Sequence, residues 1–294
     1  MSEANRVMVA MSGGVDSSVA AAILLEQGYR VEGITMRLWR EALEPEGEEP
    51  AERARAVCRL LGIAHHELDL RSAFYEQIVL HFAQEYARGR TPNPCLRCNR
   101  LLKFGALLHL AAERGCHGLA TGHYARIEQS ERGWHLLCAT DGSKDQSYFL
   151  YSLGQDELSK ALFPLGALTK AEVRERARKW GLPVAEQAES QDICFLRDGD
   201  YRRFLAEHLQ GAVEPGPIYD RQGQRLGQHR GLAFYTVGQR EGLGIAASRP
   251  YYVLALDSSR NALVVGHAEE LGRRALLAEE MRYVAGRALP DGSS

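Results

Sequence analysis

The stretch RVMVAMSGGVDSSVAAAILLEQG, residues 6–28, constrains the fold of this chain more than any other. Residues 6–11 form an apolar run with β-branched members, and residues 18–27 have the Ala, Ile and Leu content of a helix that ends at Gly28. A second apolar run, residues 29–36, follows the helix. A strand, a glycine loop, a helix and a second strand in this order predict a βαβ unit, and therefore an α/β fold with a parallel sheet.

The same alternation of helices and strands continues to about residue 197. Thr169 and Glu172 form a capping-box pattern at the start of one helix, and Gly181 with Pro183 is typical of its end. The acidic segment at residues 41–50 is expected to be a loop. We expect further helices at residues 51–62, 72–89 and 99–115, and strands at residues 65–70 and 118–128, the last followed by a glycine-containing loop.

The composition changes near residue 200, where glycines and short β-like runs replace the alternating pattern. Residues 251–266 have the pattern of a hairpin. We therefore predict a first domain over residues 1–200 and a smaller, β-rich domain over residues 201–272.

Length and composition place the chain among ordinary globular proteins. Its 294 residues are 45% hydrophobic and 25% charged. No run approaches the roughly 18 apolar residues of a membrane helix, and the N-terminus lacks the features of a signal peptide, so we expect a cytoplasmic protein with no membrane partner. Six cysteines in a reducing compartment favour metal binding or catalysis over structural disulfides.

The formal net charge of −2 gives no global sign of a nucleic-acid partner. Any basic surface must be local. Residues 88–103 carry five basic residues and no acid, and residues 221–230 carry three arginines and no acid. The plain alternative for either run is a solvent-exposed surface that binds no nucleic acid.

The loop SGGVDSS has the composition of an anion site, because it joins a strand to the N-terminus of a helix. Gly13 and Gly14 allow a tight turn and a close approach of phosphate to the backbone. Asp16 would repel phosphate unless Mg²⁺ lay between them, which predicts metal-nucleotide binding. No Lys follows the glycines, so this is not a P-loop. Hydroxyl donors are available from Ser12, Ser17 and Ser18. A simple glycine turn with Ser and Asp helix caps is the plain structural alternative.

Cys95 and Cys98 lie three residues apart in TPNPCLRCNR, residues 91–100. A zinc site would need further ligands, and the chain has no second C-x-x-C pair. A thioredoxin-like pair lacks an oxidoreductase context, and a turn flanked by prolines and arginines is not a typical core position for structural cysteines. Positive charge and a helix N-terminus would both lower the pKa of a thiol, which makes Cys98 a candidate nucleophile.

Several motifs together resemble known families. SGGVDSS resembles the S-G-G-x-D-S signature of PP-loop ATP pyrophosphatases. SGGVDSS, NPCLRCN and SQDICFL together, with ATGHYAR at residues 120–126 and KDQSYFL at residues 144–150, resemble the tRNA-specific 2-thiouridylases. The resemblance covers essentially the whole chain. It implies a doubly wound parallel sheet that binds ligands beyond the carboxyl ends of its strands. It also implies that residues 273–294 are the start of a C-terminal β-barrel that this chain does not complete, which should weaken tRNA binding.

The resemblance implies a sulfurtransferase that makes 2-thiouridine at the wobble position of tRNA. ATP with Mg²⁺ would adenylate the C2 oxygen of uridine; Cys194 matches the cysteine that carries a persulfide, and Cys98 matches the nucleophile, the two then forming a transient disulfide. A sulfur donor protein or relay would load Cys194. The matching ATP-binding residues are Ala10, Met11, Ser12, Gly13, Gly14, Val15, Asp16, Ser17, Met36 and Gly122. The matching contacts to the target base and tRNA are Asn93, Pro94, Cys95, His123, Lys144, Asp145 and Gln146.

Cys95 departs from the family pattern, because many relatives have Asp at this position. Cys95, Cys98 and Cys194 could together hold a [4Fe-4S] cluster that delivers sulfide, which is an alternative route to the same product. Two other classes remain open: a PP-loop amide-forming ligase, which would have no use for the cysteine motifs, and a metal-stabilised RNA-binding module. We expect a monomer by default.

Overall fold

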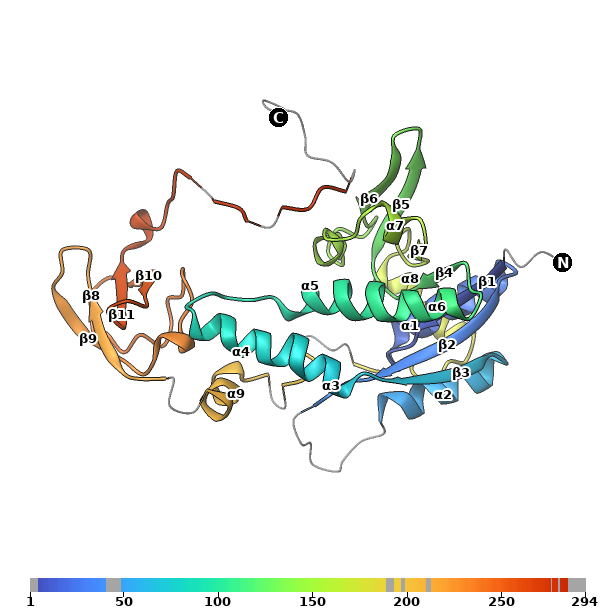
Figure 1. Cartoon of the computed structure of the whole chain (residues 1–294), viewed down its shortest axis with the longest axis horizontal. Helices are drawn as coiled ribbons and strands as arrows, with labels where there is room; N and C mark the ends of the chain where they lie inside the picture. The colour runs from blue at the N-terminus through green and yellow to red at the C-terminus, as the bar shows by residue number, and fades with distance from the viewer. Residues whose placement is uncertain are drawn as a thin grey trace. The chain divides into compact units, whose positions relative to one another are not determined.

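The computed structural model describes residues 5–40, 49–188, 193–196, 199–209, 213–275, 277–279 and 281–284 (Figure 1). The chain forms two compact units. Unit 1 comprises residues 1–74, 95–191 and 280–294, and unit 2 comprises residues 75–94 and 192–279. No described helix combines the length and the apolar character that a membrane span requires.

Unit 1 is built on a parallel five-stranded sheet, which confirms the predicted α/β fold. The strand order is β3-β2-β1-β4-β7. The chain therefore moves outward in one direction from β1 and then returns to β1's other side with β4, so the strand order reverses between β1 and β4. The strands are β1 (Arg6–Ala10), β2 (Arg30–Arg37), β3 (Ala64–Asp69), β4 (Gly118–Ala120) and β7 (Ala161–Leu162).

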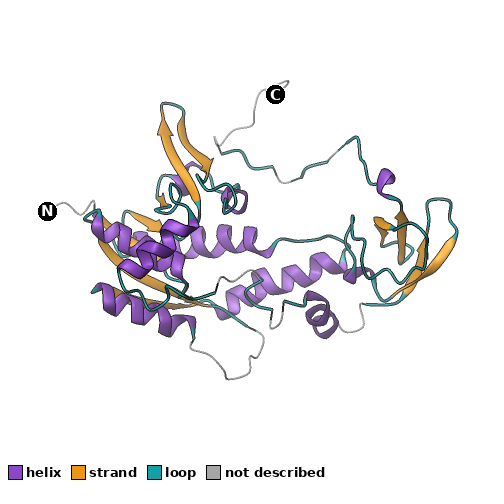
Figure 2. Ribbon diagram, turned by 180° about the vertical axis from the view of Figure 1, so that it is seen from behind, coloured by secondary structure: helices purple, strands orange, loops and turns teal. Residues whose placement is uncertain are grey.

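Helices cover both faces of this sheet because the central strand is apolar on both sides (Figure 2). Val7 and Val9 pack with one apolar cluster, whereas Met8 between them packs with another. Helices α1 (Val15–Glu26), α2 (Pro50–Leu61) and α8 (Lys170–Lys179) contribute to the first cluster. The second cluster lies under one helical stretch, α5 (Pro94–Cys98), η3 (Asn99–Leu107) and α6 (Leu108–Glu113), with η3 in π-helical geometry.

The predicted capping box is present at the start of α8. Thr169 Oγ1 accepts a hydrogen bond from the backbone N–H of Glu172, and the Glu172 carboxylate accepts one from the backbone N–H of Thr169. The helix expected at residues 72–89 is present as α3 (Arg71–Phe74), the π-helical η2 (Tyr75–Val79) and α4 (Leu80–Ala87). Most of the predicted acidic loop, residues 41–48, lies outside the described residues.

The expectation of one strand over residues 118–128 is wrong. β4 ends at Ala120, residues 121–124 form a loop, and β5 (Ala125–Ser130) pairs with β6 (Gly133–Cys138) in a separate antiparallel ribbon. The chain turns at Gly122 because it packs against the start of α1, where a Cβ atom on Gly122 would lie 2.7 Å from the backbone nitrogen of Ser17. The short elements η4 (Ser147–Leu150) and α7 (Gln155–Leu158) follow this ribbon.

Unit 2 contains a four-stranded sheet of order β10-β11-β8-β9. The predicted hairpin is confirmed as the antiparallel pair β10 and β11, and β11 continues the sheet by pairing in parallel with β8. Ile218, Val253 and Leu263 are fully buried in its core. The elements are α9 (Tyr201–His208), β8 (Gly216–Tyr219), β9 (Arg225–His229), η5 (Leu232–Phe234), β10 (Tyr252–Asp257), β11 (Ala262–Gly266) and η6 (Ala268–Glu270). We predicted that residues 273–294 start a C-terminal β-barrel; of these, residues 276, 280 and 285–294 lie outside the described residues.

Candidate functional site

The glycine loop lies at the carboxyl end of β1, directly before α1. The backbone N–H of Met11 donates to the Ile34 carbonyl at 2.8 Å, and Thr35 Oγ1 donates to the Met11 carbonyl at 2.9 Å. These bonds tie the loop to β2. Gly13 has a left-handed φ of 75°, and a Cβ atom at this position would lie 2.4 Å from the Pro50 carbonyl oxygen. Only glycine fits both requirements.

The serines of the loop divide into two kinds. Ser17 Oγ accepts a hydrogen bond from the Ser12 backbone at 3.2 Å and donates to the Gly14 carbonyl at 3.2 Å. Ser18 is fully buried, and its hydroxyl donates to the same carbonyl at 2.8 Å. The Ser17 and Ser18 hydroxyls therefore both hold the loop in this structure, whereas we expected them to donate to phosphate. Ser12 is exposed.

Asp16 is held by a lysine that sequence reasoning missed. Nζ of Lys170 lies 2.7 Å and 2.8 Å from the two carboxylate oxygens of Asp16, and the Tyr124 hydroxyl donates to Oδ1 at 2.9 Å. The Lys170 side chain is only 12% exposed. The charge of Asp16 is thus compensated within the protein by the Lys170 ammonium, and Mg²⁺ beside this carboxylate stays a prediction. The only signal in the sequence was a lysine at the first position of α8, 154 residues away.

Gly122 brings the loop after β4 against the start of α1. A Cβ atom on Gly122 would lie 2.8 Å from the carbonyl carbon of Asp16. The loops after β1 and β4 therefore meet at the point where the strand order reverses, which is where open α/β sheets bind ligands. Met36, near the carboxyl end of β2, is half-buried and packs on the cluster under η3 and α6.

The two cysteines of NPCLRCN occupy the first turns of the α5–η3–α6 helix. Cys95 is exposed and Cys98 is buried, with 8% of its surface accessible. Partial desolvation by neighbouring atoms raises the pKa of the Cys95 thiol, and the positive charge of Lys103 opposes this shift. Asn99, which follows Cys98, is buried, and its Nδ2 donates to the Phe149 carbonyl at 2.9 Å. This bond fixes the α5–η3–α6 helix, called the cysteine helix below, to η4.

Hydrogen bonds connect the glycine loop with the KDQ segment, residues 144–146. The backbone N–H of Tyr124 donates to Gln146 Oε1 at 3.0 Å, and the backbone N–H of Gln146 donates to the Tyr124 carbonyl at 2.8 Å. Because the Tyr124 hydroxyl also bonds Asp16, one tyrosine joins the two segments. With the bond from Asn99 to Phe149, the glycine loop, the 121–124 loop, the KDQ segment and the cysteine helix form one hydrogen-bonded site in unit 1.

Asp145 and His123, two of the predicted RNA contacts, each form side-chain hydrogen bonds within unit 1. The Asp145 carboxylate accepts hydrogen bonds from the Ala139 backbone at 2.7 Å and from the Ser147 hydroxyl at 2.7 Å, so it shapes the turn. His123 is half-buried, and its Nδ1 lies 2.7 Å from Thr121 Oγ1. Desolvation, reinforced by the charge of Lys103, holds the pKa of His123 well below its usual value, so the imidazole is neutral at pH 7.

Cys194 belongs to unit 2, where it is exposed. The next residue, Phe195, is buried in an aromatic cluster, with ring centroids 5.4 Å from Phe82 of α4 and 5.5 Å from Phe204 of α9. The buried ring therefore anchors the backbone beside an accessible thiol. Ser190, Gln191 and Asp192 of the same motif lie outside the described residues.

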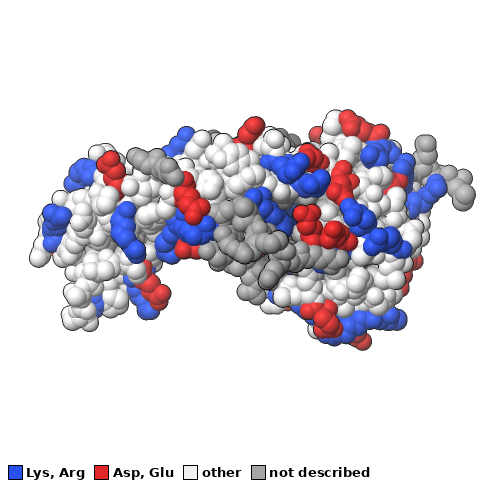
Figure 3. Space-filling model, turned by 90° about the horizontal axis from the view of Figure 1, so that it is seen from below, with Lys and Arg blue, Asp and Glu red and all other residues white. Residues whose placement is uncertain are grey.

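No group of three or more His, Cys, Asp or Glu side chains suited to a metal ion occurs among the residues that the structure describes. Cys58 of unit 1 is a poor reagent, because it is buried and desolvation raises its pKa to about 11. On the face drawn in Figure 3, Lys and Arg side chains lie interspersed with Asp and Glu. This face therefore has no extended basic patch among the described residues.

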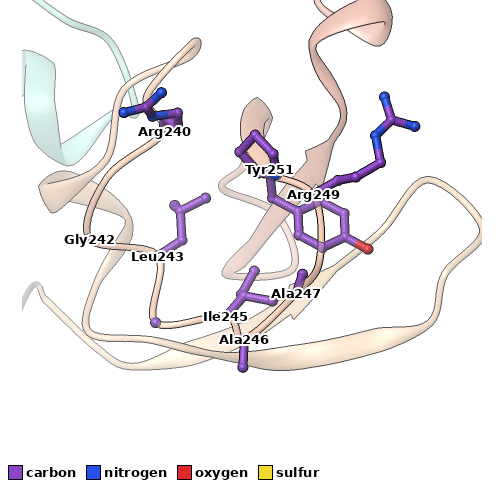
Figure 4. A pocket seen from close by; sticks show the side chains of 10 residues that line it. Arg240, Gly242, Leu243, Ile245, Ala246, Ala247, Arg249 and Tyr251 are labelled. Atoms are coloured by element: carbon purple, nitrogen blue, oxygen red, sulfur yellow. The ribbon is translucent and has the colours of Figure 1, made fainter.

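Unit 2 also holds a cavity of about 460 Å³ formed by the loop between β9 and β10 (Figure 4). Leu243, Ile245 and Ala247 lie between Arg240 and Arg249, which flank it. None of the predicted site residues lines this cavity.

Comparison with known proteins identifies relatives over nearly the whole chain. The family model described as "tRNA methyl transferase HUP domain" matches residues 5–198, and "tRNA methyl transferase PRC-barrel domain" matches residues 202–267. Two relatives are each named tRNA-specific 2-thiouridylase MnmA. The protein from Moorella thermoacetica is 49% identical over 96% of this chain and 82% of its own length. The protein from Chloroflexus aurantiacus is 52% identical over 91% of this chain and 76% of its own length.

Proposed function

The chain belongs to the tRNA-specific 2-thiouridylase family, and on this premise we propose that it uses ATP to replace the C2 oxygen of the wobble uridine of tRNA with sulfur. The observation that carries the proposal is a chain of hydrogen bonds in unit 1. Tyr124 bonds both Asp16 of the glycine loop and Gln146 of the KDQ segment. Asn99 of the cysteine helix bonds the Phe149 carbonyl in the turn that follows this segment. A nucleotide loop and a thiol helix fixed to one scaffold suit a reaction that needs ATP and a sulfur nucleophile together.

Adenylation solves the leaving-group problem of this reaction. The uridine C2 oxygen attacks the α-phosphorus of ATP, the bond to the β,γ-phosphates breaks, and pyrophosphate leaves. AMP is then the leaving group at C2. The terminal sulfur of a persulfide on Cys194 attacks C2 and AMP departs. The Cys98 thiolate next attacks Sγ of Cys194, so the transferred sulfur stays on C2 as 2-thiouridine. A Cys98–Cys194 disulfide forms, and an external dithiol reduces it.

The glycine loop supplies the nucleotide site of this proposal. Residues Ala10 to Ser17, with Met36 and Gly122, would surround ATP, and the backbone N–H groups at the start of α1 would face its phosphates. The Lys170 ammonium beside Asp16 adds positive charge and keeps the carboxylate from repelling an anion. Mg²⁺ bound to ATP would neutralise part of the charge of the leaving pyrophosphate.

The RNA would approach the cysteine helix. The helix carries Arg97, Arg100 and Lys103 and no acid before Glu113, which suits a polyanion. Asn93 to Cys95, His123, Lys144 and Gln146 are the proposed contacts to the target base and its neighbours. His123 would act as a neutral hydrogen-bonding group because its pKa is depressed. Asp145 would act through the turn that it holds. The exposed thiol of Cys194 is accessible to a separate sulfur donor protein.

The test is a reconstituted reaction with tRNA transcript, ATP and a sulfur source, in which nucleosides are analysed by mass spectrometry. We expect ATP-dependent 2-thiouridine from the wild type and from Cys95→Ser, and none from Cys98→Ser or Cys194→Ser, while all variants still bind tRNA.

Each rival function gives a different result in this assay. A methyl transferase, the activity in the family model's description, would yield a methylated base and need a methyl donor. An amide-forming ligase would exchange pyrophosphate into ATP only with an amino acid. A metal-stabilised RNA-binding module would lose its fold or its RNA binding in Cys98→Ser. Sulfur delivery by a [4Fe-4S] cluster, the alternative route, would require Cys95 as well.

A further inference from the structure

Two tyrosines on the turn after the KDQ segment face solvent. Tyr148 is 62% exposed and Tyr151 is 51% exposed, so both belong to the exposed large hydrophobic side chains of the described residues. Tyr148 lies in the short 3₁₀ helix η4, and Tyr151 directly follows it. Because residues three apart point the same way in a 3₁₀ helix, the two rings lie on the same face of this turn. Their ring centroids are 6.2 Å apart with the planes at 43°, so neither ring covers the face of the other.

The backbone that carries these rings is fixed at several points. Leu150 is fully buried and Leu153 nearly so, and both pack in the core under the cysteine helix. The carboxylate of Asp145 accepts a hydrogen bond from the Ser147 hydroxyl, and Gln146 is paired with Tyr124. A rigid turn that exposes apolar rings to water does not gain the free energy that burial of these rings would provide. A ligand that covers the rings would explain why they are exposed.

The setting of the turn indicates which ligand this is. Asn99, next to Cys98, bonds the Phe149 carbonyl, which lies between the two tyrosines in the sequence. The cysteine helix is basic from Arg97 to Lys103, and Arg282, from another part of the chain, donates to the Ser152 carbonyl at 3.4 Å. Aromatic rings on a segment that is hydrogen-bonded to a basic helix and to Arg282 suit single-stranded RNA, whose unstacked bases have apolar faces and whose backbone is anionic.

We propose that Tyr148 and Tyr151 form a stacking surface for the unstacked anticodon-loop bases that neighbour the target uridine. This inference rests on the proposed function and extends it to how the loop is held open. Flipping a base out of its stack costs free energy, and rings that receive the neighbouring bases offset that cost. Because stacking reads no particular hydrogen-bonding edge, such a surface tolerates different bases beside the uridine.

The test uses a synthetic anticodon stem–loop RNA with uridine at the wobble position and 2-aminopurine at the next loop position. Binding is measured by fluorescence anisotropy, and stacking by quenching of 2-aminopurine. We expect Tyr148→Ala and Tyr151→Ala each to weaken binding about 5- to 150-fold and to reduce the quenching. Tyr148→Phe and Tyr151→Phe should bind within about 2-fold of the wild type, because phenylalanine also stacks.

Two further readouts separate stacking from other effects. Leu60→Ala, a change at a similarly exposed apolar side chain on α2, should leave binding unchanged. The slope of log affinity against log salt should be the same for the wild type and the alanine variants, because tyrosine contributes no phosphate contact.

The proposal is overturned if the alanine variants bind and quench like the wild type, or if the phenylalanine variants lose as much as the alanine variants. Normal RNA binding with loss of sulfur-donor binding would also overturn it, because the rings would then be a protein interface. If the wild type does not bind the stem–loop at all, the proposed function fails and the stacking surface fails with it.

Discussion

Replacing Lys170 with methionine should destabilise unit 1 because it leaves Asp16 without its counter-ion. The change removes two charge-assisted hydrogen bonds from Lys170 Nζ to the Asp16 carboxylate, at 2.7 Å and 2.8 Å. The carboxylate keeps the hydrogen bond that the Tyr124 hydroxyl donates. Breaking a buried ion pair costs about 3–5 kcal/mol. Water reaches the Asp16 side chain, which is 33% exposed, so we expect the lower figure of about 2–3 kcal/mol.

Thermal unfolding followed by circular dichroism measures this loss. For a chain of this size, each kcal/mol lowers the midpoint by about 2–4 °C, so Lys170→Met should unfold about 5–10 °C below the wild type. Lys179→Met, at the exposed end of the same helix, is the matched control and should change the free energy of unfolding by less than about 1 kcal/mol. The Asp16→Asn/Lys170→Met double variant should lose less than the two single changes together, because no unpaired charge remains. A midpoint for Lys170→Met within about 1 °C of the Lys179→Met midpoint would refute this reasoning.

Three further predictions follow from the site. Gly122→Ala should abolish ATP binding and cost about 1–3 kcal/mol of stability, because its Cβ atom would lie 2.7 Å from the Ser17 backbone nitrogen. Gly142→Ala, with no atom within 4 Å of the new carbon, is its control in isothermal titration calorimetry. The folded-state pKa of His123 is depressed, so its contribution to stability should be intact above about pH 6.5 and fall as the pH drops below that. His123→Asn should therefore flatten the dependence of the free energy of unfolding on pH, and an unchanged dependence would contradict a depressed pKa for His123. Iodoacetamide at pH 8 should modify the exposed Cys194 well before the buried Cys58, whose pKa is raised to about 11; peptide mass spectrometry reads the order, and equal rates would contradict it.

Local patterns in the sequence were enough to predict much of unit 1. Alternating apolar strands and amphipathic helices follow from short-range periodicity, and the capping box at Thr169 depends on residues only three apart. The glycine loop was also predictable, because two consecutive glycines between a strand and a helix suit the left-handed φ that Gly13 adopts. These features depend on chemistry that a short window of sequence contains.

Contacts between distant residues were not predictable in the same way. The break of the strand at Gly122 comes from the close approach of α1, and the ion pair between Asp16 and Lys170 joins residues 154 positions apart. Residues 75–94 pack with residues 192–279 in unit 2, which no local pattern indicates. The role of Ser18 depends on complete burial, whereas its sequence suggested only a free hydroxyl. The predicted domain limits at residues 200 and 272 stay a prediction.

The most direct test of the account is a single turnover with protein purified without oxygen, in which iron, acid-labile sulfide and 2-thiouridine are measured on the same sample. Cys194 is first loaded as a persulfide, and ATP and tRNA are then added without any other sulfur source. The account predicts 2-thiouridine from iron-free protein and a Cys98–Cys194 disulfide after turnover, with the product lost in Cys98→Ser and kept in Cys95→Ser. About four iron atoms per chain, with activity that disappears when iron is removed or when Cys95 is replaced, would contradict it.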